Sequence, residues 1–284
     1  MGFIKNNKRF FILFIVCLVA IILFTLQGTH FYTMVGDYYS GNKYQRFIGW
    51  EVSSPIQLYL EVLDRTYYFD SLLTIGTNPL QTLIPIFSIV GCISFYKRYH
   101  RILKFSFVKI AHFKRELYRI IIIDSLKLAL ALFFAYLCFY MICDHLMFFN
   151  TNPVHSVLGE GRSFLADLLP QDFYFRHTYL YFLFDELVWF FYIPFIYAML
   201  VQASALIIPK PRYFLAIVIL CCYVLFIISN LIIVFAPRYI IYINPLLRSI
   251  KNVHMNSKVL LLINSIPLFL SIAIIEWRGR HVEI

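Results

Sequence analysis

The chain has 284 residues, of which 61% are hydrophobic and only 14% are charged, and its mean hydropathy is +0.75. A soluble domain carries about 25% charged residues, so this composition excludes a water-soluble globular protein and predicts an integral membrane protein. The formal net charge of +10 then indicates Lys and Arg residues sorted to cytoplasmic loops. It does not by itself indicate a surface that binds nucleic acid, and we expect no nucleic-acid partner.

Six apolar windows approach the roughly 20 residues that a helix needs to cross a bilayer. In chain order they are 10–26, 79–96, 120–143, 184–208, 213–236 and 259–275. We therefore predict an all-α membrane protein with six transmembrane helices. The first window is longer than the apolar core of a signal peptide and no A-x-A cleavage site follows it, so we expect an uncleaved span.

The segments between these windows differ in charge, and the difference predicts the orientation. With the N-terminus inside, 15 of the 25 Lys and Arg residues fall in cytoplasmic segments and nine fall in the longer outer loops. Only Lys127 remains, within the third window. Because basic residues accumulate on the cytoplasmic side, both termini are predicted to be cytoplasmic.

The outer loops also contain predicted structure. Ser54 and Pro55 are typical of an N-cap followed by a proline at the first helical position, and the apolar residues after them recur with helical spacing. We therefore predict a short interfacial helix there. The outer segment 237–258 mixes apolar and basic residues and predicts a second interfacial or re-entrant element.

Four charged residues lie in or at the edge of the apolar windows. Asp124 and Lys127 are spaced i and i+3 in the third window, which predicts a structural ion pair on one helix face. Asp185 and Glu186 open the fourth window. Solvation at the outer headgroup level is the first interpretation of these two acids, and a place on a translocation path is the second.

Motifs for catalysis, nucleotide binding or metal binding are not found in the sequence. The nearest match to a P-loop runs from Gly36 to Lys43, but its spacing is wrong for phosphate binding. Asp144, His145 and His155 are metal-ligand types in one loop, yet solvated loop residues are the favoured interpretation. We therefore predict no catalytic, cofactor-binding or metal-binding residue in this chain, and we expect that it is not an enzyme.

The segment 97–119, called the basic segment below, is the inner connection between the second and third windows. Its sequence KRYHRILKFSFVKIAHFKRELYR holds eight of the 25 Lys and Arg residues and one acid, Glu116. Orientation by positive charge accounts for the basic residues but not for the phenylalanines between them. We predict a short helix along the inner membrane surface, with its basic residues toward headgroups or a partner.

These features together resemble the permease subunit of an ABC-2-type ABC transporter. The resemblance is carried by Pro85 in the second window, by the basic segment directly after that window, and by Arg119 followed by Lys127 at the entry to the third span. It is also carried by the outer segment PRYIIYINPLLRSI before the last window.

The resemblance implies that residues 1–284 form a single permease domain whose basic segment contains a coupling helix. In such permeases this helix docks on a cytosolic ATPase subunit, which binds ATP and Mg²⁺, so this chain binds no cofactor itself. The implied partners are those ATPase subunits, a second copy or a homologous permease, and the lipid bilayer. The residues implied in the ATPase contact are Lys104, Phe105, Val108, Lys109, His112, Arg115, Glu116 and Arg119.

The function implied is export of a hydrophobic or amphipathic cargo (a peptide, lipid or drug) across a plasma membrane. Residue usage rich in Ile, Lys, Asn and Phe suggests a bacterial source. Two other classes fit part of the pattern. A non-transporting membrane protein, such as an immunity factor or scaffold subunit, shares the topology without needing an ATPase. A membrane-bound acyl or glycosyl transferase needs a catalytic cluster that the sequence does not display.

Overall fold

The structure is a computed structural model, and it describes residues 8–40, 54–66, 69–100, 113–146, 173–208, 210, 213–214, 216 and 265–280. Within these ranges every regular element is a helix, which confirms the all-α class for the described part of the chain. The helices are α2 (Lys8–Gly28), α3 (Phe31–Tyr39), α5 (Pro55–Thr66), α6 (Phe69–Arg98), α8 (Phe113–Leu146), α9 (Phe173–Arg176), α10 (Thr178–Leu187), the π-helix η4 (Val188–Tyr192), α11 (Ile193–Ile207) and α14 (Ile266–Arg280).

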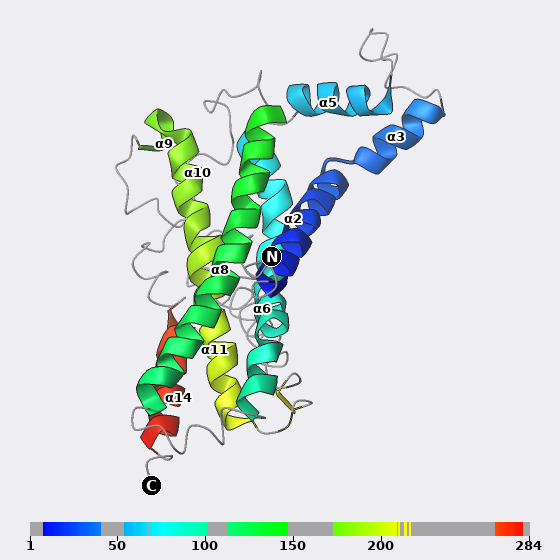
Figure 1. The fold of residues 1–284 in the computed structure, drawn as a ribbon. Helices are drawn as coiled ribbons and strands as arrows, with labels where there is room; N and C mark the ends of the chain where they lie inside the picture. Colours follow the sequence, from blue (N-terminus) through cyan, green and yellow to red (C-terminus); the bar gives the residue numbers. More distant parts are fainter. Residues whose placement is uncertain are drawn as a thin grey trace, which may run out of the picture.

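The long helices pack into a bundle, the short helix α5 lies across one end of it, and α3 slants between α2 and α5 (Figure 1). Helix α11 contacts α6, α8 and α14, while α2 packs against α6 and α8. The last turns of α6, α11 and α14 and the first turns of α8 lie at the opposite end, at the bottom of Figure 1. This end is called the basic end below, because both flanks of the basic segment are there.

Three of the described helices are long and apolar enough to cross a membrane: Lys8–Gly28, Lys114–His145 and Tyr179–Ile207. They contain or overlap the first, third and fourth predicted spans, and they support a membrane protein. Helices α6 and α14 overlap the second and sixth windows. Almost all of the fifth window, 213–236, lies outside the described residues, so the total of six spans stays a prediction.

The helices extend beyond the apolar windows at the basic end. Lys97 and Arg98 belong to the last turn of α6, and α8 begins at Phe113. The basic segment therefore contains the end of one helix and the start of another, and most of the short helix predicted within it falls in 101–112, outside the described residues. The first turns of α8 are amphipathic: Leu117 is buried whereas Arg115 is exposed. Their charged residues lower the local hydropathy, so the apolar window placed the start of α8 too late in the chain, at residue 120 instead of Phe113.

The short helix predicted after Ser54 is confirmed as α5, and its place at the membrane interface stays a prediction. The Ser54 hydroxyl oxygen accepts a hydrogen bond of 3.2 Å from the backbone N–H of Gln57, which is the N-cap arrangement. The hydroxyl groups of Tyr59 and Thr29 share a buried hydrogen bond of 2.7 Å. The Tyr59 ring also meets the Phe31 ring edge to face, with centroids 4.8 Å apart. These contacts anchor α5 to the junction between α2 and α3.

The outer face of α5 remains apolar. Ile56 and Leu60 are 62% and 40% exposed, whereas Leu58 and Leu63 on the other side of the helix are buried. A helix with apolar residues on both faces, lying across the end of a membrane bundle (Figure 1), suits the membrane interface.

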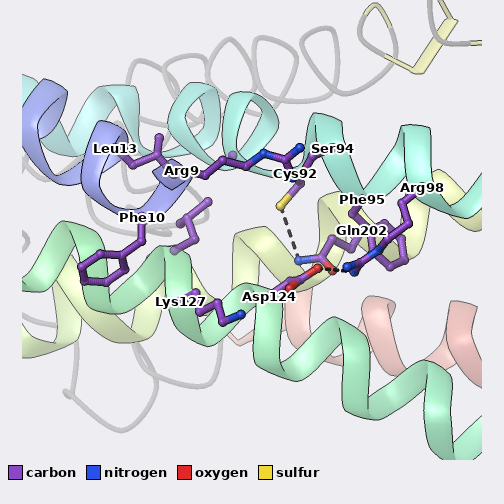
Figure 2. A pocket seen from close by; sticks show the side chains of 12 residues that line it. Arg9, Phe10, Leu13, Cys92, Ser94, Phe95, Arg98, Asp124, Lys127 and Gln202 are labelled. Carbon is purple, nitrogen blue, oxygen red and sulfur yellow. Dashed lines mark hydrogen bonds and ion pairs between the residues drawn. The ribbon is translucent and has the colours of Figure 1, made fainter. Parts of the chain in front are cut away.

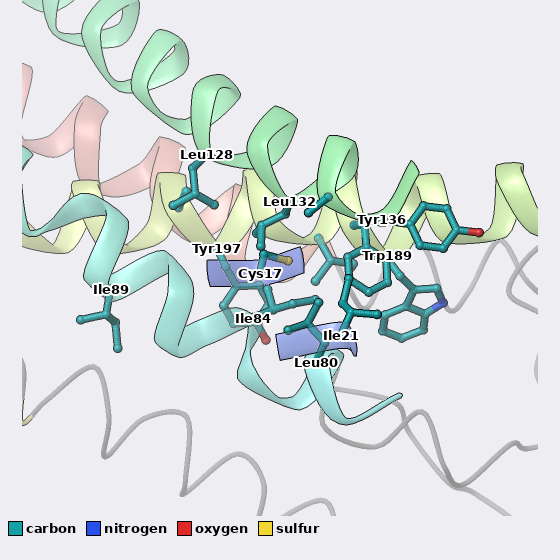
Figure 3. Packing of buried hydrophobic residues seen from close by; sticks show 14 of the residues in the cluster. Cys17, Ile21, Leu80, Ile84, Ile89, Leu128, Leu132, Tyr136, Trp189 and Tyr197 are labelled. Carbon is teal, nitrogen blue, oxygen red and sulfur yellow. The ribbon is translucent and has the colours of Figure 1, made fainter. Parts of the chain in front are cut away.

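The core of the bundle is apolar and is built from α2, α6, α8, η4 and α11 (Figure 3). Cys17 and Ile21 of α2 are fully buried. The rings of Tyr136 and Phe190 stack with centroids 5.2 Å apart and an interplanar angle of 12°. Aromatic stacking between α8 and η4 adds to area burial in fixing how these helices face each other.

Close approach of the helices depends on small residues of α6. A Cβ atom added to Gly91 would lie 2.3 Å from Cδ1 of Leu128 in α8. A Cβ atom added to Gly76 would lie 2.4 Å from Oγ1 of Thr25 in α2. Small residues allow membrane helices to pack closely, so α6 sits tightly between α2 and α8 at these two points.

A π-helical turn precedes the proline of the fourth window. In η4 the backbone N–H of Ile193 bonds the carbonyl of Val188, five residues earlier, and Pro194 follows directly. Proline has no N–H to donate, and a π turn is one way a helix accommodates an irregular hydrogen-bond ladder. The widened turn buries Trp189 and Phe190 in the bundle.

Candidate functional site: a basic pocket among four helices

A pocket of about 160 Å³ lies where α2, α6, α8 and α11 meet, toward the basic end (Figure 2). Its floor and walls include apolar side chains of α2, α6 and α8. The side chains with N, O or S atoms that line it are Arg9, Cys92, Ser94, Arg98, Asp124, Lys127 and Gln202. Four separate helices therefore contribute polar groups to one small cavity.

An ion pair between helices forms one side of the pocket. Nη2 of Arg98, in the last turn of α6, lies 2.6 Å from Oδ2 of Asp124 in α8. The predicted pairing of Asp124 with Lys127 is therefore wrong: within the described part of the chain, Lys127 forms no ion pair with it. The i, i+3 spacing does place both residues on one helix face, but the fold brings a guanidinium from α6 closer to the carboxylate than the lysine of the same helix.

The pocket retains an excess of positive charge. It is lined by three cations and one carboxylate, and that carboxylate is bound to Arg98. Arg9 and Lys127 have no carboxylate within 4.0 Å among the described residues. Both side chains are exposed, so water or a ligand reaches them.

Gln202 provides a buried polar group behind these charges. Its side chain is 0% exposed, and its amide nitrogen donates to the Ser125 hydroxyl at 3.0 Å and to the Cys92 sulfur at 3.5 Å. Its Oε1 has no hydrogen-bond partner among the described residues. If the oxygen and nitrogen of the amide exchanged places, the nitrogen would be the atom without a hydrogen-bond partner. A buried polar atom without a partner costs about 1–3 kcal/mol, so this atom is a candidate ligand contact.

The residues implied in the ATPase contact are described only in part. Lys104, Phe105, Val108, Lys109 and His112 lie outside the described residues. Arg115, Glu116 and Arg119 lie on the first turns of α8. The guanidinium of Arg119 is 3.6 Å from the carboxylate of Glu116, and both side chains are well exposed, so this pair belongs to the helix surface and is open to a partner.

A second polar cluster at the basic end was not predicted. Lys114 at the start of α8 forms an ion pair with Glu276 of α14, and the Tyr118 hydroxyl donates to the same carboxylate at 2.9 Å. The cluster joins helices that are far apart in sequence. The sequence feature that could have predicted this cluster is Glu276, a lone acid directly after the last apolar window. An unpaired carboxylate is costly at that position.

The two acids of the fourth window have different outcomes. The Glu186 side chain is only 3% exposed, in the last turn of α10, so the interpretation of a solvated headgroup-level acid does not apply to it. Its role on a translocation path stays a prediction. The side chain of Asp185 lies outside the described part.

The residues considered for a metal do not assemble a site in the described part. Asp144 and His145 are exposed near the end of α8, and His155 lies outside the described residues. Among the residues that are described, no group of three or more His, Cys, Asp or Glu side chains could hold a metal ion.

Comparison with known proteins gives no match to a family model, to a curated protein or to a solved structure. The resemblance to ABC-2-type permeases is thus carried by the sequence features described above.

Proposed function

We propose that the chain is the transmembrane subunit of an ATP-driven transporter of the ABC-2 type, in the plasma membrane of a bacterium. In this proposal the chain pairs with a second copy or a homologous permease and exports a hydrophobic or amphipathic molecule. ATP and Mg²⁺ bind to separate cytosolic ATPase subunits.

The observation that supports this function best is that both flanks of the basic segment are tied to the bundle. On the α6 side, Arg98 pairs with Asp124, and a ring nitrogen of His100 lies 3.0 Å from the carbonyl oxygen of Ala205 in α11. On the α8 side, Lys114 pairs with Glu276. A force applied between these flanks would act directly on α6, α8, α11 and α14.

Such an arrangement suits a segment that transmits a partner's movement. Packed helices shift as stiff bodies against one another, so displacement of residues 101–112 would reorient several helices together. A segment whose positive charge served only to orient the chain would not need contacts with the helix bundle at both of its ends.

Charge also supports a cytoplasmic position for this end. Basic residues are frequent at the described helix ends there, namely Lys97, Arg98, Lys114, Arg115 and Lys210. The opposite end of the bundle includes the half-buried acid Asp37 and the exposed acid Asp144. Positive charge concentrates on the cytoplasmic side of membrane proteins, which is also where an ATPase would dock.

The test is assembly with an ATPase subunit encoded beside this chain. We expect the two chains to co-purify in nanodiscs, and the complex to hydrolyse ATP faster than the ATPase alone. The double variant Lys109→Glu/Arg115→Glu should weaken co-purification at least about tenfold, which corresponds to about 1.4 kcal/mol. The control is Arg176→Glu, which reverses one charge at the opposite end of the bundle.

Two outcomes would contradict the proposal. If the double variant and the control co-purify with the ATPase equally well, the basic segment is not part of the interface. A complex that assembles but shows no change in ATP hydrolysis over a panel of lipids, peptides and hydrophobic dyes would instead favour a non-transporting scaffold.

A further inference from the structure

We infer that the basic pocket is a binding site for a phosphate group, carried either by the headgroup of an anionic phospholipid or by a free phosphate compound. The inference does not depend on the proposed function, because neither an ATPase nor transport enters it. It concerns Arg9, Lys127, Arg98 and Gln202, which come from α2, α8, α6 and α11.

The first support is the charge balance of the pocket. Asp124 is the one carboxylate that lines it, and Arg98 already binds this group at 2.6 Å. Arg9 and Lys127 are left without a carboxylate within 4.0 Å in the described part of the chain. Cations at neighbouring positions of a small cavity repel each other, and a bound anion would remove that repulsion.

The second support is geometric. Figure 2 shows the side chains of Arg9, Arg98 and Lys127 arranged around the pocket from three different helices. Arginine presents a fork of N–H donors that matches phosphate oxygens, and lysine adds a point charge. Charges that converge from separate helices select a compact anion better than a row of charges on one exposed face.

The third support is the buried amide. Gln202 is fully buried and lines the pocket, and one of its polar atoms has no partner among the described residues. A protonated phosphate oxygen, or a hydroxyl group of a glycerol headgroup, would donate a hydrogen bond to Oε1 once the amide turns toward the ligand, because this atom is closed to solvent in the free pocket. The phosphate thus accounts for the cations, and its hydroxyl group accounts for the amide.

The size of the cavity limits the ligand. Pockets for drug-sized molecules measure about 300–1,000 Å³, and this one measures about 160 Å³. It accommodates a headgroup or a small phosphate compound but not a whole amphipathic cargo molecule. The pocket is therefore distinct from a cargo cavity, and its ligand would hold α2 against α6, α8 and α11.

The test compares lipid and free phosphate on the full chain. After delipidation in neutral detergent, retention of phosphatidylglycerol and of phosphatidylcholine with the same acyl chains is measured by native mass spectrometry. Thermal unfolding is recorded in parallel with inorganic phosphate and with chloride at equal ionic strength. We expect at least about tenfold preference for phosphatidylglycerol if a lipid is the source, and a rise in Tm with inorganic phosphate if a free compound is the source.

Matched double variants separate the pocket from general surface charge. Arg9→Gln/Lys127→Gln removes two pocket cations, and we expect an affinity loss of about thirtyfold, as two charge contacts of about 1 kcal/mol each imply. Lys8→Gln/Lys97→Gln removes the same net charge from exposed neighbours that do not line the pocket, and we expect less than about a threefold loss.

Further outcomes decide the inference. Equal losses in the two double variants would show unspecific attraction to the protein surface and overturn it. So would the absence of any preference for phosphatidylglycerol together with no effect of inorganic phosphate. Arg9→Gln/Lys127→Gln could lose binding because it lowers the Tm of the free protein. In that case Arg9→Lys/Lys127→Arg serves as a second variant: it keeps both charges, and it should retain binding to within about threefold.

Discussion

Arg98 and Asp124 are joined across two helices, with 2.6 Å between Nη2 and Oδ2. The pair closes α6 onto α8 at the basic end and satisfies the single carboxylate that lines the pocket. Lys127, one turn further along α8, consequently keeps its charge available to the pocket. One contact between helices thus decides both how this end is held together and which cations a ligand meets.

The two candidate partners of Asp124 can be distinguished by double-mutant cycles. For Arg98→Gln and Asp124→Asn we expect a coupling energy of about 0.2–1 kcal/mol, modest because both side chains are partly exposed. The cycle of Lys127→Gln with Asp124→Asn should give a smaller value. The free energy of unfolding is measured by denaturant titration in mixed micelles. A larger coupling for Lys127 would contradict the observed pairing.

Substitution of Gly91 should loosen the contact between α6 and α8. In Gly91→Ala the new methyl group meets Leu128 at 2.3 Å, and we expect a loss of about 1–3 kcal/mol in stability from overpacking. The double variant with Leu128→Ala should lose less than the sum of the two single variants, because the methyl group then fills the vacated space.

Gly36 provides the control for that prediction. A Cβ atom added there meets nothing within 4 Å, and the residue lies inside α3. Gly36→Ala should therefore stabilise the chain by about 0.5–1 kcal/mol through helix propensity. Equal effects at Gly36 and Gly91 would mean that backbone conformation, and not packing against Leu128, determines the result.

Neutralising Glu276 should release the end of α14. Glu276→Gln removes the ion pair with Lys114 but keeps an oxygen that accepts from Tyr118. We expect faster amide hydrogen exchange in residues 266–280 and a stability loss of about 1 kcal/mol or less, since both charged side chains are partly exposed. Glu116→Gln breaks only the pair with Arg119 within α8 and should leave exchange in α14 unchanged.

Removing one hydroxyl group should weaken the attachment of α5 to the bundle. Tyr59→Phe keeps the edge-to-face contact with Phe31 but loses the buried hydrogen bond to Thr29. We expect a loss of about 1 kcal/mol in stability and faster proteolysis near residues 54–66. Unchanged proteolysis would indicate that the apolar contacts of Leu58 and Leu63 alone hold this helix.

The sequence predicted local features of the fold well where they depend on neighbouring residues. The apolar windows located α2, α8 and the helix ending at Ile207, and the Ser-Pro pair located the start of α5. The start of α8 was misplaced, because charged residues on its exposed face lower hydropathy without interrupting the helix. The π turn before Pro194 was not predicted either.

The candidate site was much less predictable. Asp124 and Lys127 were both selected from the sequence, and both line the pocket. They were predicted to pair with each other, whereas Asp124 pairs with Arg98. Arg9, Gln202 and Glu276 were not selected as site residues, since a basic residue before a span or a glutamine within one is common and carries no sign of its neighbours.

By itself, the sequence determined that this is a helical membrane protein with a basic segment between two of its helices. Those properties follow from composition, periodicity and capping, which act between residues close in the chain. Only the tertiary structure decided that Arg98 meets Asp124, that Lys114 meets Glu276, and that three cations and a buried amide share one cavity. Such contacts depend on which helix faces pack together, and that is set by side-chain shape over the whole bundle, with glycines such as Gly91 admitting the closest approaches.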